Sequence, residues 1–190
     1  FTQTLFNNVG VLKQAGTDLN INYLLGLGNA GYLAMDLMGT YILENNFSNP
    51  LVDYDCVGYF GYQCGQATPD WRHRLRATWE SSFRLNISLA WRFLNSVTND
   101  DFSPNPTLAN PANWDLWEVN DIADIPATSY IDLAASYTFR NGIKFTLGCN
   151  NILDEEPPLA PGGYSDDGGV NLYGTYDPLG RYIFTSLQFN

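Results

Sequence analysis

Residues 83–93 alternate between apolar and polar side chains. The odd positions carry Phe83, Leu85, Ile87, Leu89, Trp91 and Phe93, and the even positions carry Arg84, Asn86, Ser88, Ala90 and Arg92. Because successive side chains of a strand point to opposite faces, this segment has one apolar and one polar face. A half-buried soluble strand sustains such alternation for about four to eight residues, whereas a strand that crosses an outer membrane needs roughly 9–11. The pattern therefore favours a membrane-crossing β-strand.

The same alternation recurs along the chain, with turns between the segments. We expect strands at residues 1–6, 11–25, 32–43, 71–80, 83–93, 130–139, 143–151 and 181–189. The expected short turns are 7–10, 26–31, 81–82 and 140–142, and the expected long loops are 44–70, 96–128 and 153–177. Bacterial barrels have short periplasmic turns and longer extracellular loops. We therefore predict that the three long loops are extracellular and that the C-terminus is periplasmic; the turn 7–10 is external by parity and is interpreted as a short external loop.

Composition supports a barrel rather than a helical membrane protein. No segment approaches the roughly eighteen consecutive apolar residues of a transmembrane helix. Charged residues make up only 15% of the chain, against about a quarter in soluble domains. Lipid offers no partner to an open strand edge, so a membrane-spanning sheet must close. The net charge of −11 argues against nucleic-acid binding. The predicted fold class is all-β, as a portion of a transmembrane antiparallel β-barrel.

Three alternate arginines determine how the segment 71–80 faces. Arg72, Arg74 and Arg76 share one side of it, and tryptophan, leucine and alanine side chains occupy the other. An arginine on the lipid side at mid-bilayer costs about 2–4 kcal/mol, so this row must face inward. The residues predicted to face the lumen are Arg72, Arg74, Arg76, Arg84, Arg92 and Asp132. Such a row binds an anionic solute or, alternatively, pairs with carboxylates such as Asp36, Asp132 and Glu80 as a solvated wall.

The first long loop contains a close pair of cysteines, Cys56 and Cys64. We expect them to form a disulfide in an oxidising compartment. The aromatic residues near this pair and in the second long loop are candidates for ligand contact; they are Tyr54, Tyr59, Phe60, Tyr62, Trp114 and Trp117. The alternatives are a disulfide that only stiffens an exposed loop, and tryptophans that meet the membrane interface or pack the loop onto the barrel.

We expect neither catalysis nor a bound metal or cofactor. The single histidine, His73, falls on an apolar row near the extracellular rim, where it cannot serve as a buried general base. The acidic segment Asp166-Asp167-Gly168-Gly169 lacks the spacing and the terminal glutamate of a calcium-binding loop. Cys149 lies alone in an expected strand and is interpreted as a lipid-facing residue.

Several motifs resemble the C-terminal barrel of TonB-dependent outer-membrane receptors. They are Asn7-Asn8-Val9-Gly10 with Gly16-Thr17-Asp18-Leu19, Cys56 with Cys64, Trp71-Arg72-His73, Asn150-Asn151-Ile152-Leu153-Asp154 with Pro157-Pro158, and Tyr176-Asp177-Pro178-Leu179-Gly180-Arg181-Tyr182. The resemblance covers essentially the whole chain, residues 1–190. It implies the last eight strands of a roughly 22-stranded barrel, with the plug domain and the earlier strands absent from this sequence.

The resemblance also implies a function in the bacterial outer membrane. Such receptors take up a scarce solute (a siderophore, a cobalamin, an oligosaccharide or similar), driven by a TonB-type energy-transducing protein that acts through the plug. Membrane lipid and lipopolysaccharide would surround the barrel. The outer-membrane assembly machinery would recognise the last strand, through Tyr182, Phe184, Leu187 and Phe189. Family members usually end on an aromatic residue, whereas this chain ends on Asn190, so we expect one further residue.

Two other interpretations compete with this one. The first is a self-contained eight-stranded barrel that acts as an anchor or an adhesin. The expected inward rows are mostly Ala, Ser, Thr and Asn, which are too small to fill such a narrow barrel, and this favours the larger one. The second is a soluble, secreted β-sandwich that binds sugar, which would stay in solution without detergent.

Overall fold

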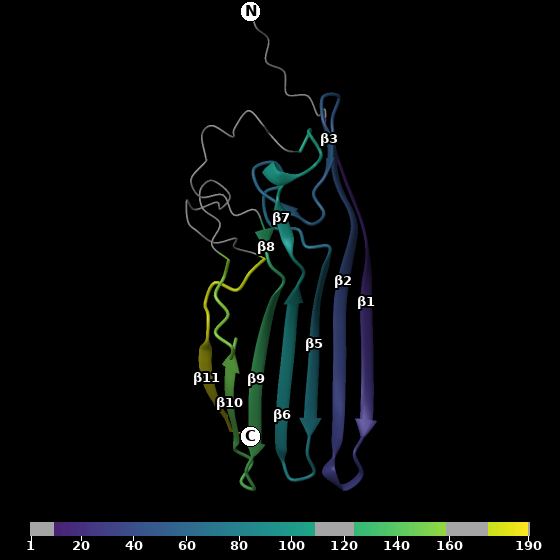
Figure 1. The fold of residues 1–190 in the computed structure, drawn as a ribbon. Coiled ribbons are helices and arrows are strands. Elements are labelled where there is room, and N and C mark those ends of the chain that lie inside the picture. Colours follow the sequence, from purple (N-terminus) through teal and green to yellow (C-terminus); the bar gives the residue numbers. More distant parts are fainter. Residues whose placement is uncertain (1–9, 109–123, 159–174, 190) are drawn as a thin grey trace, which may run out of the picture.

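A computed structural model of the chain describes residues 10–108, 124–158 and 175–189. These residues form a tall, curved, antiparallel sheet (Figure 1). Seven of its eight strands follow one another in the order β1 (Val11–Gly26), β2 (Tyr32–Ser48), β5 (Trp71–Glu80), β6 (Leu85–Leu94), β9 (Thr128–Thr138), β10 (Lys144–Asn150) and β11 (Tyr182–Gln188). The eighth, β3 (Asp53–Asp55), pairs with β2. The predicted all-β antiparallel fold is confirmed.

The strand boundaries agree closely with the alternation in the sequence, with one large difference. The predicted segment 71–80 coincides with β5, whereas β2 continues to Ser48, past the predicted end at residue 43. It continues because it has a partner on each side there: Val11–Ala15 of β1 on one, and β3 on the other. The predicted strand 1–6 and most of the turn 7–10 lie outside the described residues.

The predicted start of β6 at Phe83 is wrong, and this removes Arg84 from the polar row. The strand begins at Leu85, and Arg84 has a φ of 67°, the left-handed conformation of a turn residue. The hydroxyl of Ser81 causes the longer turn, because it accepts hydrogen bonds from the backbone N–H groups of Phe83 (3.3 Å) and Leu85 (3.0 Å). A two-residue turn was expected, but the side-chain oxygen replaces a strand partner for these donors.

The register of the sheet separates two faces. Residues paired across neighbouring strands share a face, so Leu37, Leu75 and Trp91 lie side by side on what we call the apolar face. Met38, Arg74 and Arg92 form the adjoining row on the opposite, polar face. The polar face is bulkier than expected from its small residues, because it also carries Leu24, Met38, Leu94, Tyr130 and Phe184.

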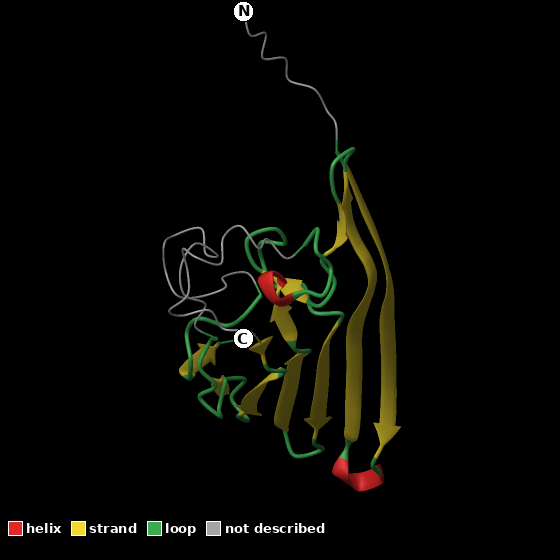
Figure 2. Cartoon of the chain, turned by 45° about the horizontal axis from the view of Figure 1, so that its top comes forward, coloured by secondary structure: helices red, strands yellow, loops and turns green. Residues whose placement is uncertain are grey.

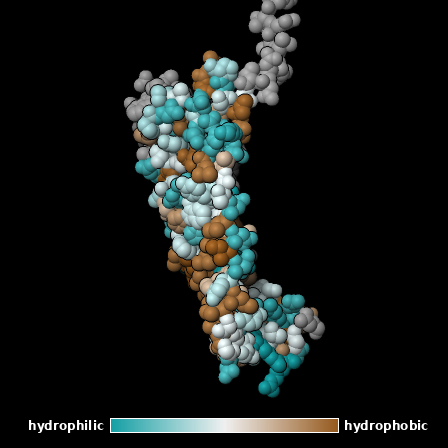
Figure 3. Space-filling model, turned by 90° about the vertical axis from the view of Figure 1, so that its right-hand side faces the viewer, coloured by the Kyte–Doolittle hydropathy of each residue, from teal (hydrophilic) through white to brown (hydrophobic). Residues whose placement is uncertain are grey.

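The short and long connections lie at opposite ends of the sheet (Figure 1). The lower end carries η1 (Gly28–Ala30), the turn 81–84 and the turn 139–143. The upper end carries the small elements between the long strands (Figure 2). In the described ranges, no helix is long and apolar enough to cross a membrane. A view onto the β1 side shows apolar residues gathered along the middle and lower parts of the sheet (Figure 3).

A second, three-stranded sheet builds the upper end. It consists of β4 (Tyr59–Phe60), β7 (Val97–Asn99) and β8 (Asp124–Ile125), with β4 and β7 parallel. Buried side chains of this sheet and of two neighbouring loop segments form a cluster that we call the loop core: Phe60, Ala67, Val97, Ile125 and Tyr176. Burial in this cluster raises the pKa of the Tyr176 hydroxyl to about 12. The long connections therefore contain packed structure of their own.

The disulfide predicted between Cys56 and Cys64 is confirmed, with sulfur atoms 2.08 Å apart. A carboxylate holds the loop that this disulfide closes. Asp100, in the helical turn η2 (Asp100–Phe102), is 0% exposed. Its Oδ2 accepts hydrogen bonds of 2.8 Å from the backbone N–H groups of Gln63 and Cys64. The disulfide loop is thus fixed to the segment that follows β7 by charge-assisted hydrogen bonds.

Gly61 lets the Asp100 carboxylate approach the loop, and replacing it should loosen the loop. A Cβ at Gly61 would lie 2.1 Å from Asp100 Oδ1, and its φ is +143°. Both this variant and its control carry the strain of a positive φ, about 1–2 kcal/mol, so the collision with Asp100 distinguishes them, and we expect chymotrypsin to cleave Gly61→Ala after the exposed Tyr62 about tenfold faster than the control. The matched control is Gly65→Ala, where φ is +70° and no atom lies within 4 Å of the new Cβ. Equal cleavage of the two variants, read by mass spectrometry, would contradict this role.

The same carboxylate should make the disulfide loop sensitive to pH. Burial, followed by the neighbouring charge of Asp101, raises the pKa of Asp100 against the lowering effect of its backbone donors. The folded loop then binds a proton more tightly than the unfolded loop, so its stability rises as pH falls from neutral to below the ordinary value of about 3.9. We expect hydrogen exchange at Gln63 and Cys64 to slow on acidification, relative to Asp100→Asn at each pH. A relative acceleration would contradict the sign.

Candidate functional site

The candidate site lies on the polar face, in the upper half of the sheet. Here β5 presents Arg72, Arg74 and Arg76 at every second position, all three exposed. Alternate residues of a strand are about 7 Å apart, so the three guanidinium groups form a column of positive charge along one strand. The register pairs Arg74 with Arg92 of β6, which places a fourth arginine beside the column. These four arginines therefore share one face of the sheet; that this face lines a lumen stays a prediction.

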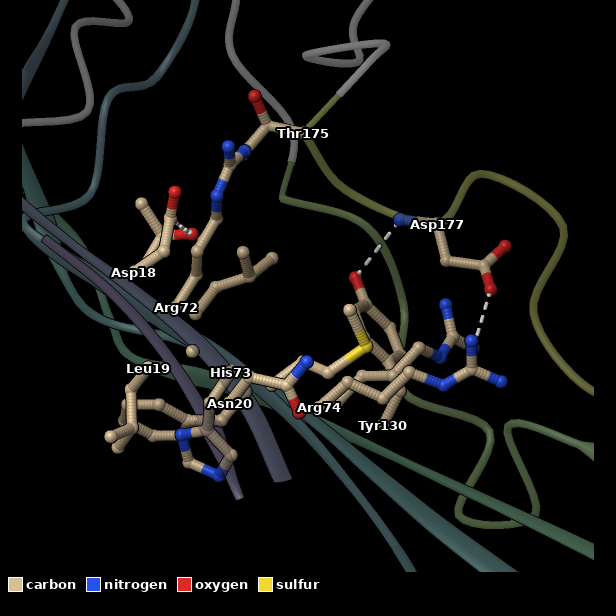
Figure 4. A pocket seen from close by; sticks show the side chains of 15 residues that line it. Asp18, Leu19, Asn20, Arg72, His73, Arg74, Tyr130, Thr175 and Asp177 are labelled. Carbon is tan, nitrogen blue, oxygen red and sulfur yellow. Dashed lines mark hydrogen bonds and ion pairs between the residues drawn. The ribbon is translucent and has the colours of Figure 1, made fainter. Parts of the chain in front are cut away.

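A pocket of about 570 Å³ opens against this column (Figure 4). The sheet contributes most of its lining, and the segment before β11 contributes the rest. The residues that line it are Asp18, Leu19, Asn20, Met38, Gly39, Thr40, Arg72, His73, Arg74, Arg92, Phe93, Leu94, Tyr130, Thr175 and Asp177. Its volume falls in the range of small-molecule sites, about 300–1,000 Å³. Arg76 does not line this pocket, although it belongs to the same row.

Arg92 is the best-connected side chain of the site. Its Nε and Nη2 each donate a 3.0 Å hydrogen bond to the carboxylate of Asp132 on β9, a bidentate pair. Nη2 also donates to Asp177 Oδ2 at 2.9 Å, and the guanidinium lies 4.9 Å from the centre of the Tyr130 ring. Asp132 was predicted to face the polar side, and here it pairs with Arg92. Arg92 therefore joins the sheet to the segment before β11.

The side chains of Arg72, Arg74 and Arg76 differ from that of Arg92 in having no ion pair or hydrogen bond to any other residue that the structure describes. Arg76 has Asp36 opposite it in the register of β2, whereas Arg74 has Met38 there. The interpretation of the row as a solvated, charge-paired wall thus fits Arg92 with Asp132. At Arg74, positive charge faces the pocket without a described counter-charge.

Two of the receptor-like motifs, residues 150–154 and 176–182, meet beside the pocket. Asn151, fully buried and with φ of 49°, donates through Nδ2 to the carbonyl of Glu155 (2.8 Å) and accepts through Oδ1 from its N–H (2.9 Å). The backbone N–H of Asn151 donates to Asp132 Oδ1 at 2.9 Å. Asp154 Oδ1 accepts from the backbone N–H of Arg181 at 2.9 Å. The motifs therefore hold the two ends of the third long connection together.

Sequence reasoning did not identify these roles of Asn151, Asp154, Tyr130 and Asp177. Tyr130 attaches the third long connection to the sheet, because its hydroxyl accepts a 3.2 Å hydrogen bond from the backbone N–H of Asp177. The asparagine and aspartate could have been suspected, because both types favour turns and positive φ. The contact between Tyr130 and Asp177 had no such signal, since 47 residues separate them and only the fold brings them together.

The candidate ligand-contacting aromatics separate into buried and exposed residues. Phe60 is 1% exposed in the loop core, and Tyr54 is 9% exposed beside Leu108. The prediction that these two contact a ligand is wrong, because both side chains are buried by packing within the loops. Tyr59 packs partly buried against the same cluster as Tyr54, and Tyr62 is 68% exposed. Trp114 and Trp117 lie outside the described residues, as does Asp166-Asp167-Gly168-Gly169.

The single histidine lies on the apolar face among aromatic rings. His73 stacks on Phe93 at 5.2 Å between ring centres and meets Trp91 edge-on at 4.6 Å. Trp71 Nε1 donates a 2.9 Å hydrogen bond to His73 Nδ1. This packing gives the imidazole a structural role. Among the described residues, no group of three or more His, Cys, Asp or Glu side chains could hold a metal ion.

The last strand continues the same two-faced pattern. On β11, Ile183 and Leu187 pair with Cys149 and Phe145 on the apolar face. Phe184 points to the polar face, where its ring covers Gly148: a Cβ there would lie 2.2 Å from the ring. Tyr182 begins the strand, and Phe189 follows its end. Recognition of these residues by an assembly machinery stays a prediction.

Comparisons with known proteins bear on the fold alone. No family model and no curated protein sequence matches the chain. A crystal structure of the ferric enterobactin receptor PfeA from Pseudomonas aeruginosa, solved as a point mutant, is similar with a TM-score of 0.52 and 18% sequence identity. The match covers 94% of this chain and 22% of that receptor. The chain is thus an all-β, antiparallel structure whose fold matches a fragment of an outer-membrane receptor barrel.

Proposed function

We propose that this chain forms the C-terminal part of the barrel wall of a TonB-dependent receptor in the bacterial outer membrane. The observation that carries the proposal is the two-faced open sheet, which has one apolar face, one arginine-bearing face and all of its long connections at one end. Similarity of fold to part of a ferric enterobactin receptor supports it. The chain spans about a fifth of that receptor, so the activity of the complete protein is part of the proposal.

In the proposed barrel, the apolar face contacts lipid and the lipid part of lipopolysaccharide. Tyr23, Tyr41, Trp71, Trp79, Trp91 and Tyr137 lie toward the ends of its rows. Aromatic residues at these heights form the girdles that anchor a barrel at both membrane interfaces. The polar face lines the lumen, and the upper connections, near residues 44–70, 96–128 and 153–177, are extracellular.

The proposed receptor admits a scarce small solute through its lumen. The upper connections help to select a siderophore, a cobalamin, an oligosaccharide or a similar nutrient. A plug domain carried elsewhere in the complete protein opens the passage when a TonB-type energy-transducing protein acts on it. The outer-membrane assembly machinery inserts the barrel through its last strand. We propose no catalytic step, because the single histidine is committed to aromatic packing on the apolar face.

A self-contained eight-stranded barrel, acting as an anchor or adhesin, is the second candidate. It requires the first and last strands to pair, whereas β1 and β11 form opposite edges of the sheet in the described residues. Open edges of this length demand further strands in a membrane. The observation supports a larger barrel, to which the complete protein contributes more strands.

A pair of adjacent substitutions on β6 tests the placement in lipid. Leu89 lies on the apolar face and Ser88 on the polar face. If the proposal holds, Leu89→Arg lowers the free energy of unfolding of the complete protein in lipid vesicles by about 2–4 kcal/mol, the cost of an arginine near the bilayer midplane. Ser88→Arg should cost less than about 1 kcal/mol, because the new charge enters a wet lumen.

Denaturant titrations followed by tryptophan fluorescence measure both values, and the two variants control each other. The same charge is added at neighbouring positions of one strand, so a general loss of β-structure affects both. A larger cost for Ser88→Arg than for Leu89→Arg would place the apolar face away from lipid and contradict the proposal.

Labelling of intact cells tests which end is outside. Leu51, 90% exposed at the upper end, and Arg140, exposed in a lower turn, become the only free thiols in Leu51→Cys and Arg140→Cys variants of a Cys149→Ser background. A membrane-impermeant maleimide should label Leu51→Cys on intact cells, and Arg140→Cys only after the outer membrane is permeabilised. Labelling in the reverse order would invert the proposed topology.

A further inference from the structure

Arg74 has an unfavourable position in the sheet. Across the strand pair β5–β6 it faces Arg92, and like charges directly opposite each other destabilise a sheet. The positive charge of Arg92 is balanced by Asp132 and Asp177, whose carboxylates accept hydrogen bonds from its guanidinium. Arg74 has Met38 on its other side and no carboxylate partner among the residues that the structure describes. The two carboxylates that bind Arg92 offset part of this repulsion, but the Arg74 guanidinium itself makes no ion pair or hydrogen bond with a residue that the structure describes.

Arg72 is in a similar state one row higher. Its cross-strand neighbours are Thr40 and Leu94. The nearby carboxylate of Asp18 accepts a 2.8 Å hydrogen bond from the hydroxyl of Thr40. Figure 4 shows Arg72 extending into the pocket toward Thr175, with Arg74 deeper beside Tyr130. Two guanidinium groups that make no ion pair with a described residue thus enter the same pocket, in a chain whose net charge is −11.

We propose that this pocket is a subsite for a small solute that carries at least two carboxylate or phosphate groups, which Arg72 and Arg74 bind. The inference rests on the proposed function, because it names the class of solute that the receptor takes. Guanidinium groups bind both kinds of anion through paired hydrogen bonds. Arg92 offers only its Nη1, because its Nε and Nη2 already donate to the two aspartates.

The dimensions of the pocket favour a small solute over an acidic protein segment. Its volume of about 570 Å³ suits a molecule of ordinary ligand size. A protein surface would meet the whole arginine column, including Arg76, which lies outside the pocket lining. Arg76 therefore separates the two kinds of occupant: a small anion in the pocket leaves it free, whereas an acidic surface along the wall uses it as well.

Calorimetric titration of the complete receptor, purified in detergent at low ionic strength, tests the proposal. The probes are tricarballylate, which carries three carboxylates, inorganic pyrophosphate, and sucrose as a neutral compound. We expect the wild type to bind at least one of the two anions and not sucrose. Arg72→Gln and Arg74→Gln should each weaken anion binding about tenfold, the effect of removing one charged hydrogen-bonding group. Arg76→Gln and Arg140→Gln are the matched controls and should bind as the wild type does.

Three results would overturn the subsite: absence of anion binding, equal binding of sucrose, or a loss in Arg76→Gln as large as that in Arg74→Gln. The last result would indicate that binding depends on the charge of the whole arginine column, as expected for an acidic partner surface. Circular dichroism of each variant confirms that the barrel is folded. The titration requires neither uptake nor a membrane, so its failure in a protein that passes the Leu89 and Ser88 test removes the subsite alone. If the Leu89 and Ser88 test fails, the proposed placement of the sheet in a membrane barrel is contradicted, whatever the titration gives.

Discussion

The structure depends on the separation of two environments by a sheet one residue thick. Every second side chain of each long strand faces the same way, so a shift of register by one residue would exchange all of them. Leu75 and Trp91 lie together on one face, and Arg74 and Arg92 lie together on the other. In the proposed barrel, lipid would contact the first pair and exclude the second. This exclusion would fix the facing and the register of the whole sheet.

The candidate site follows from that separation. The arginines of β5 and β6 share the polar face, where only a few acidic groups meet them. Asp132 and Asp177 hold Arg92 and so tie the segment before β11 to the wall. Arg72 and Arg74 are left facing the pocket that this segment helps to close. The loop core and the disulfide build the rest of the upper end, and the short turns close the lower end.

Alternation was sufficient to predict the strands and their faces, because a period of two leaves little ambiguity over ten residues. It failed where other contacts set the end of a strand. Ser81 lengthens a turn and removes Arg84 from β6, and pairing with β3 extends β2 to Ser48. Burial of Tyr54 and Phe60 depends on contacts between distant loop segments, which no local pattern reveals. For the same reason, pairing of Arg92 with Asp177 could not be foreseen.

The most direct test of the two-faced wall is spin-label accessibility along β6. Single nitroxide labels at each position from Leu85 to Leu94, in a Cys149→Ser background of the complete protein in lipid vesicles, report collisions with oxygen, which partitions into lipid, and with a water-soluble nickel complex. The account predicts oxygen maxima at Leu85, Ile87, Leu89, Trp91 and Phe93, and nickel maxima at the even positions. A profile without a period of two, or with oxygen maxima on the arginine face, would contradict it.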